Sequence, residues 1–139
     1  MNILFVCRYN RFRSRIAKDY FNKINKNKNI RSKSAGLIKG SPLSPRTIKV
    51  AKEFGLDING RVNGLSSKLM AWQNIVVIVA DDVPKAVFDK NKKYYKKKVI
   101  NWKIKDAKYE TKTEIKKLVK QIMKKADYLN KQLENKKWK

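Results

Sequence analysis

The chain has 139 residues, of which 36 are lysine or arginine and 11 are aspartate or glutamate, giving a formal charge of +25. It has no histidine, which excludes Ser–His–Asp triads, Cys–His dyads and histidine-ligated metal sites. Its single cysteine, Cys7, excludes a disulfide framework and any mechanism that needs a second thiol in the same chain.

The first half of the chain alternates twice between a strand pattern and a helix pattern. The apolar run at 3–6 predicts a strand that is buried on both faces. Apolar residues at helical spacing predict a helix over 14–27, and residues 29–36 predict a second strand that ends at a glycine. Ser44 as N-cap and Pro45 as first helical residue predict the start of the next helix.

The second half continues the alternation and ends on a long helix. Residues 74–80 are uncharged and rich in β-branched side chains, which predicts a buried strand. Apolar residues between 115 and 133 step by three or four, as they do on the buried face of a helix. The other predicted segments are a loop at 60–64, one or two helical turns at 66–72, a helix at 83–90 capped by Asp81 or Asp82, and a strand at 98–102.

This alternation of strands and helices predicts an α/β fold in one domain, 1–139. We expect a three-layer sandwich in which a four-stranded parallel sheet carries helices on both faces. Open sheets of this kind bind ligands beyond the carboxyl ends of their strands. The segment that follows the first strand is therefore the first place to look for a functional site.

The charge of +25 has two interpretations. Clustered lysine and arginine side chains bind the phosphate backbone of nucleic acids. Lysines spread over solvent-facing surfaces instead keep a small domain in solution, and we favour this interpretation for most of the excess. The stretch 92–98 has five lysines and two tyrosines and is either a solvated loop or a docking surface for nucleic acid or acidic partners.

No apolar run reaches the roughly 20 residues that a membrane-spanning helix needs. Residues 1–7 are too few for the apolar part of a secretory leader, and no basic residues precede them. Together with one free cysteine, these features predict a cytoplasmic protein without membrane contact.

The segment between the first strand and the first helix combines Cys7, Arg13 and Ser14. A loop that enters a helix points backbone N–H groups and the positive end of the helix dipole at one spot, where an oxyanion fits. The same groups favour the thiolate of Cys7, which is the form that attacks phosphorus. Arg13 can donate two hydrogen bonds to phosphoryl oxygens, and Ser14 can donate one to the sulfur. An inert buried thiol is the alternative, but three arginines within six residues argue against it.

The spacing Cys-x5-Arg-Ser after an N-terminal strand resembles that of the low-molecular-weight protein tyrosine phosphatase family. Three later segments are similar to elements of the same family. The resemblance therefore extends from Asn2 to the last helix. These segments are Ser34-Ala35-Gly36, the stretch 44–58, and Asp106 to Tyr109 in the place of an Asp-Pro-Tyr loop.

The resemblance implies a two-step hydrolysis of phosphotyrosine in proteins, or of a small aryl phosphate, without metal or cofactor. Cys7 attacks the phosphoryl group while Asp106 protonates the leaving oxygen, and Asp106 then activates the water that hydrolyses the cysteinyl phosphate. It also implies that Asn10, in a left-handed backbone conformation, holds the loop open through Ser14 and Ser34. The residues of the phosphate-binding loop are then Arg8, Tyr9, Asn10, Arg11, Phe12 and Ser14.

Several positions depart from the family pattern. Tyr9 stands where glycine usually precedes the asparagine, Phe12 where a second cysteine is common, and Ala107 where proline follows the general acid. The histidine that commonly supports the asparagine is missing, with Gly60 or Arg61 nearest to its place.

The substrate slot lacks an obvious aromatic wall, because the loop after the second strand is short. Tyr9, Tyr109 or Tyr94 are the candidates for this wall. Arg8 and Arg11 add positive charge at the mouth of the loop, which favours dianionic or polyanionic ligands.

The sequence argues against two related enzyme activities and leaves one binding function as an alternative. An arsenate reductase would need further cysteines, and the resemblance places a small threonine of phosphoarginine phosphatases where this chain has Arg11, which repels a guanidinium. A second class is a catalytically weak, basic phosphate- or nucleic-acid-binding module on the same fold, in which Tyr9 blocks the pocket. We expect Asp81 and Asp82 to cap a helix rather than to bind Mg²⁺.

Overall fold

A computed structural model describes residues 1–88 and 98–135 of the chain. Its strands β1 (Asn2–Cys7), β2 (Arg31–Gly36), β3 (Ile75–Ile78) and β4 (Lys98–Asn101) form one sheet in the order β2-β1-β3-β4. All three strand pairs are parallel, so all four carboxyl ends lie at one edge. The predicted parallel four-stranded sheet is confirmed.

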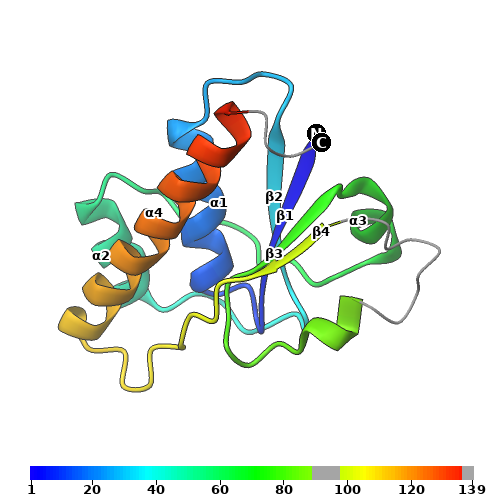
Figure 1. The fold of residues 1–139 in the computed structure, drawn as a ribbon. Helices are drawn as coiled ribbons and strands as arrows, with labels where there is room; N and C mark the ends of the chain where they lie inside the picture. Colours follow the sequence, from blue (N-terminus) through cyan, green and yellow to red (C-terminus); the bar gives the residue numbers. More distant parts are fainter. Residues whose placement is uncertain (89–97, 136–139) are drawn as a thin grey trace.

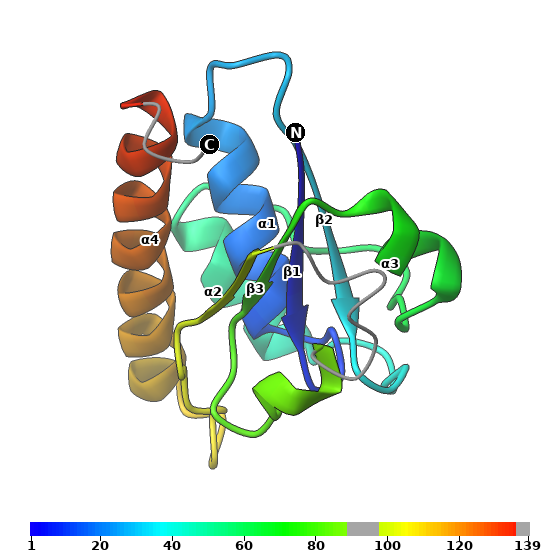
Figure 2. The same cartoon turned by 45° about the vertical axis from the view of Figure 1, so that its right-hand side comes forward.

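Helices cover both faces of this sheet (Figure 1; Figure 2). Helices α1 (Arg13–Ile24), α2 (Pro45–Glu53) and α4 (Lys112–Glu134) lie on one side, and α3 (Ser67–Trp72) lies on the other with a 3-10 turn, Lys85–Phe88. Alternate residues of β1 point to opposite sides, as a strand requires. Ile3 and Phe5 enter the core beneath α1, α2 and α4, and Leu4 and Val6 enter the core beneath α3. The three predicted layers are confirmed.

Helix α1 packs along α4, so the first and last helices of the chain are neighbours. Buried residues of α4 recur at the predicted spacing, from Ile115 to Leu129. At the surface of this contact the hydroxyl of Tyr20 donates a hydrogen bond of 2.7 Å to Asp127. Burial and this hydrogen bond raise the pKa of Tyr20 to about 12.

Two predicted segments differ from the structure or lie outside it. A regular helix does not begin at Val83, because the following Pro84 disfavours helical backbone in the residue before it. Within the described residues 83–88 of the predicted helix, the 3-10 turn Lys85–Phe88 is the helical segment that forms. Of the predicted lysine-rich stretch 92–98, residues 92–97, with Tyr94 among them, lie outside the described residues, and Lys98 is the first residue of β4. Among the helices that are described, none is long and apolar enough to cross a bilayer.

Candidate active site

The loop of residues 8–12 connects the carboxyl end of β1 to α1, and we call it the phosphate loop. Cys7, the last residue of β1, pairs with Gly36 at the end of β2. A Cβ atom on Gly36 would lie 2.6 Å from a backbone carbon of Tyr9 and 2.7 Å from the nitrogen of Asn10. Glycine at this position therefore lets the phosphate loop pass directly over the end of β2.

The backbone of the phosphate loop is held with its carbonyl groups turned away from the site. Backbone N–H groups within 37–40 donate to the carbonyl oxygens of residues 7–9, over 2.9 to 3.3 Å. Within the described parts of the chain, the N–H groups of residues 8–12 meet no acceptor. A run of unpaired N–H groups leading into a helix is a binding site for an oxyanion.

Asn10 is the centre of a hydrogen-bond network beneath the phosphate loop. It is fully buried and has a left-handed backbone, with φ 57°. Its amide group donates to Ser14 Oγ at 2.8 Å and to Ser34 Oγ at 3.0 Å. Its Oδ1 accepts from the backbone N–H of Asn63 at 2.9 Å. The expected conformation of Asn10 and its contacts with both serines are confirmed.

Cys7 lies at the base of this network and is buried. Its Sγ is 3.0 Å from Ser14 Oγ. Because Asn10 donates to Ser14 Oγ, the hydroxyl hydrogen of Ser14 is free to donate to the sulfur. Ser14 can therefore stabilise a thiolate at Cys7.

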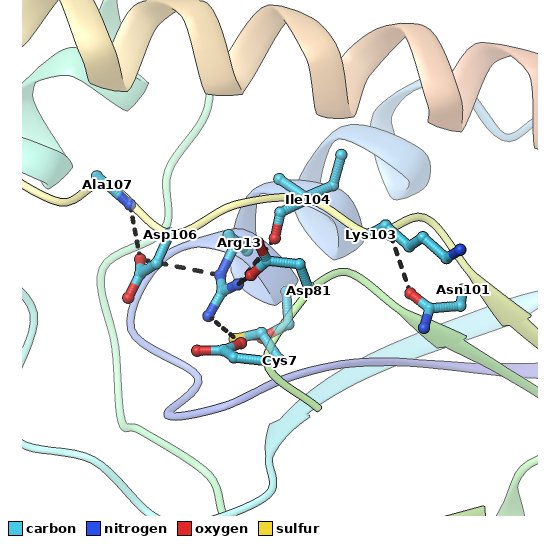
Figure 3. Close-up of polar contacts among 10 residues, drawn as sticks. Cys7, Arg13, Asp81, Asn101, Lys103, Ile104, Asp106 and Ala107 are labelled. Carbon is cyan, nitrogen blue, oxygen red and sulfur yellow. Dashed lines mark hydrogen bonds and ion pairs between the residues drawn. The ribbon is translucent and has the colours of Figure 1, made fainter. Parts of the chain in front are cut away.

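Arg13 is only 2% exposed, and its guanidinium lies among three carboxylates (Figure 3). Its Nη2 is 3.0 Å from Asp82, and its Nη1 and Nε are 3.8 Å from Asp81 and Asp106. Its Nη1 also donates to the carbonyl of Ile104 at 2.9 Å. The expectation that Asp81 and Asp82 cap a helix is wrong, because both side chains are at Arg13 instead.

Asp106 lies on the loop between β4 and α4, and its carboxylate lies beside the guanidinium of Arg13 (Figure 3). Its carboxylate is 53% exposed and accepts a hydrogen bond of 2.9 Å from the N–H of Ala107. A pocket of about 40 Å³ opens here, with room for about three water-sized groups. The residues that line it include Cys7, Tyr9, Arg11, Phe12, Arg13 and Asp106.

Two residues that the sequence placed at this pocket do not line it. The side chain of Tyr109 is 72% exposed, and the ammonium group of Lys108 lies over its ring. The guanidinium of Arg8 lies over the ring of Tyr9, 5.3 Å from its centre. Of the tyrosines proposed for the wall, Tyr9 lines the pocket and Tyr109 does not, and Tyr94 lies outside the described residues.

Sequence reasoning missed Arg15, the third residue of α1. It is 8% exposed, and its Nη1 donates to Asn10 Oδ1 at 3.0 Å. Arg15 thus supports Asn10, whereas the sequence pointed to Gly60 or Arg61 as the nearest replacement for the missing histidine. Arg61 contributes its backbone carbonyl, which accepts from Arg15 at 2.8 Å. Burial lowers the pKa of Arg15, and the nearby Cys7 partly opposes that effect. The sequence did contain one signal of this role, because Arg15 stands in the first turn of the predicted helix on the side that faces the core.

Comparison with known proteins agrees with this geometry. The family model described as low molecular weight phosphotyrosine protein phosphatase matches residues 2–139. The chain belongs to this family. It is therefore a cysteine-dependent phosphatase at the level of the family. A search of curated proteins found no match.

Solved structures of several activities share the fold. A low molecular weight protein tyrosine phosphatase from T. tengcongensis is 26% identical, with a TM-score of 0.81 over 95% of this chain and 99% of that one. The YwlE arginine phosphatase from Geobacillus stearothermophilus is 21% identical, with a TM-score of 0.84 over 97% and 94%. An arsenate reductase from Archaeoglobus fulgidus is 20% identical, with a TM-score of 0.72 over 92% and 98%. Likeness to these structures leaves the substrate open.

Proposed function

We propose that this family member hydrolyses phosphotyrosine in proteins through a cysteinyl-phosphate intermediate. The observation that carries the proposal is the pocket itself, in which Cys7, Arg13 and Asp106 meet beside the unpaired N–H groups of residues 8–12. These N–H groups and Arg13 match the oxygens of a phosphoryl group, and Cys7 lines the same pocket.

In the first step, the thiolate of Cys7 attacks phosphorus and the bond to the phenolic oxygen breaks. Asp106 gives its proton to that oxygen as the bond breaks. Its exposed position at the rim suits this role, because the leaving group departs toward solvent. Arg13 exchanges its contact with Asp82 for the phosphoryl oxygens, whose charge it stabilises in the transition state.

In the second step, water attacks the phosphorus of the cysteinyl phosphate and the S–P bond breaks. The electron pair of that bond returns to sulfur, where Ser14 donates its hydrogen bond. Asp106 takes the proton from the water and is thereby ready for the next cycle. One carboxyl group serves both directions, so the mechanism needs no histidine.

Tyrosine is favoured over the other substrates of the fold by the pocket walls. Tyr9 and Phe12 line the pocket, and aromatic walls suit a phenyl ring. Arg11 also lines it and is fixed by a 3.2 Å hydrogen bond from its Nε to the carbonyl of Pro42. A fixed cation at this place disfavours phosphoarginine, and the single cysteine disfavours arsenate reduction.

The test compares three substrates with the purified protein: a phosphotyrosyl peptide, a phosphoarginyl peptide and arsenate with thioredoxin. We expect vanadate-sensitive phosphate release from the phosphotyrosyl peptide and from p-nitrophenyl phosphate, lost in Cys7→Ser. Faster release from phosphoarginine would redirect the proposal to that substrate. Absence of any turnover, together with a salt-dependent shift of nucleic acid, would favour the basic binding module.

A further inference from the structure

Arg15 carries a buried positive charge and has no carboxylate within 4 Å among the described residues, although Asp19 and Asp57 line the same surface hollow. Its Nε donates to the carbonyl of Ile58 and its Nη1 to that of Arg61, both at 2.8 Å. Carbonyl dipoles satisfy the N–H groups but do not cancel the charge. Because a buried charge without a close counterion is costly, an anion at the other end of its hydrogen bonds would stabilise it.

A chain of hydrogen bonds leads from this cation to the sulfur. Arg15 Nη1 donates to Asn10 Oδ1 at 3.0 Å, Asn10 Nδ2 donates to Ser14 Oγ at 2.8 Å, and Ser14 Oγ is 3.0 Å from Cys7 Sγ. When Cys7 is a thiolate, Ser14 must be the donor of the last bond, and every donor in the series then points toward the sulfur. Hydrogen bonds in series polarise one another, so the cation at one end strengthens the bond that Ser14 donates at the other.

We propose that Arg15 is a positioning residue whose charge is paired with the Cys7 thiolate through Asn10 and Ser14. Burial lowers the pKa of Arg15 overall, and the nearby charge of Cys7 opposes part of that fall, which is the effect expected of a partner. The proposal rests on the cysteine chemistry of the family and not on the choice of tyrosine as substrate. In this chain, which has no histidine, Arg15 is then the residue that supports Asn10.

Two consequences follow for catalysis. The charge of Arg15 favours the thiolate that attacks phosphorus in the first step. In the second step, the S–P bond breaks and its electron pair returns to a sulfur that is stabilised by the same chain. Arg15 touches neither substrate nor sulfur, so its loss affects the rates of both steps more than the binding of substrate.

The first test is the rate of alkylation of Cys7 by iodoacetamide between pH 4 and 10, compared in wild type, Arg15→Met and Arg15→Lys. We expect the midpoint of this profile to rise by about one pH unit in Arg15→Met, because a neighbouring cation commonly shifts an acid by that amount. Arg15→Lys keeps the charge and should stay near the wild-type midpoint. With p-nitrophenyl phosphate we expect kcat to fall about tenfold in Arg15→Met, with KM changed less than twofold.

Arg61→Met is the matched control, because it removes an adjacent exposed arginine and leaves the backbone carbonyl that Arg15 uses. It should leave the midpoint unchanged. The effect of Arg15→Met should also shrink when Ser14 is already alanine, because the series of hydrogen bonds from Arg15 to the sulfur is then interrupted. A folded Arg15→Met with the wild-type midpoint, or an equal effect with and without Ser14, would overturn the proposal.

A second measurement uses the wild-type chain and so does not depend on the folding of a variant. The side-chain N–H signals of Arg15 in NMR spectra should shift with pH along the same curve as the alkylation of Cys7. This shift should vanish in Cys7→Ser. Signals that do not follow the thiol would contradict the proposed pairing, even if the protein hydrolyses aryl phosphates.

Discussion

Arg13 and Arg15 stand two residues apart on one helix, and both are buried, yet their surroundings are opposite. Arg13 faces the pocket and lies within 4 Å of three carboxylates, those of Asp81, Asp82 and Asp106. Arg15 lies beneath the phosphate loop, where its described partners are carbonyl and amide oxygens. The two cations therefore differ in how their charge is compensated before any substrate arrives.

This difference separates two tasks in phosphoryl transfer. The charge of Arg13 is matched by carboxylates at rest and becomes available when a phosphoryl group replaces them. The charge of Arg15 has no such partner in the described chain, so it acts on the sulfur throughout the cycle. The groups around each arginine thus determine its role: Arg13 binds the phosphoryl group, and Arg15 stabilises the nucleophile.

The largest expected effect is that of shortening Arg13. Arg13→Lys keeps the charge but loses the two parallel N–H groups that match a phosphoryl group, so kcat/KM for p-nitrophenyl phosphate should fall by about 10²- to 10³-fold. Arg15→Lys should lose less than about tenfold, because its role depends on charge. Steady-state kinetics of both variants tests the comparison directly. Equal losses would remove the distinction between the two arginines.

The next largest effect should come from Asp106. Among the three carboxylates near Arg13, it is the one that we assign to proton transfer. Asp106→Asn should lower kcat by about 10²-fold and remove the basic-side limb of the pH–rate profile. The loss should be larger for phenyl phosphate than for p-nitrophenyl phosphate, because the poorer leaving group depends more on its proton. Asp57→Asn, a surface carboxylate outside the pocket, is the control. An unchanged profile in Asp106→Asn would move the acid role elsewhere.

A variant of Asp82 tests whether carboxylates neutralise the charge of Arg13 before an oxyanion binds. One buried oxygen of Asp82 has no hydrogen bond in the described structure, and its contact is the ion pair with Arg13. Asp82→Asn removes the competitor for that guanidinium, so tungstate should inhibit about fivefold more tightly. Asp81→Asn, whose more exposed carboxylate lies 3.8 Å away, should change inhibition less. Weaker inhibition in Asp82→Asn would mean that Asp82 orients Arg13 instead of competing for it.

The phosphate loop could be predicted from the sequence because its signals are local. A strand, a helix start and the Cys-x5-Arg-Ser spacing fall within 13 consecutive residues, from 2 to 14, and these fixed the positions of Cys7 and Arg13. The contacts of Asn10 with both serines followed from the family resemblance and are confirmed. The four parallel strands and the cover of helices on both faces of the sheet were likewise predicted from the alternation of patterns, whereas the order of the strands was not.

The carboxylates around Arg13 and the role of Arg15 could not be predicted in the same way. Asp81 and Asp82 follow β3, and their approach to Arg13 depends on the pairing of β1 with β3, which is distant in sequence. Arg15 was hidden because a charged side chain in a first helical turn usually faces solvent. Its burial depends on the carbonyls of Ile58 and Arg61, more than 40 residues away.

The smallest expected effect concerns the far end of α1, which carries both arginines. The pKa of Tyr20 is raised to about 12 from an ordinary value of 10.0, so the protonated phenol stabilises the fold below pH 10. That contribution is lost as pH rises from 10 toward 12. Tyr20→Phe should cost about 1 kcal/mol in the free energy of unfolding at pH 7, measured by urea denaturation, and the difference from wild type should shrink toward pH 12.

Tyr20→Phe also tests whether the position of α1 or the charge of Arg15 controls the reactivity of Cys7. Its hydrogen bond to Asp127 ties α1 to α4 at a distance from the pocket, so its loss affects Arg13 and Arg15 equally. We therefore expect kcat and the alkylation midpoint of Cys7 to stay within about twofold and a few tenths of a pH unit of wild type, respectively. A midpoint that moved in Tyr20→Phe as far as in Arg15→Met would show that the position of α1, and not the charge beneath the loop, sets the reactivity of the sulfur.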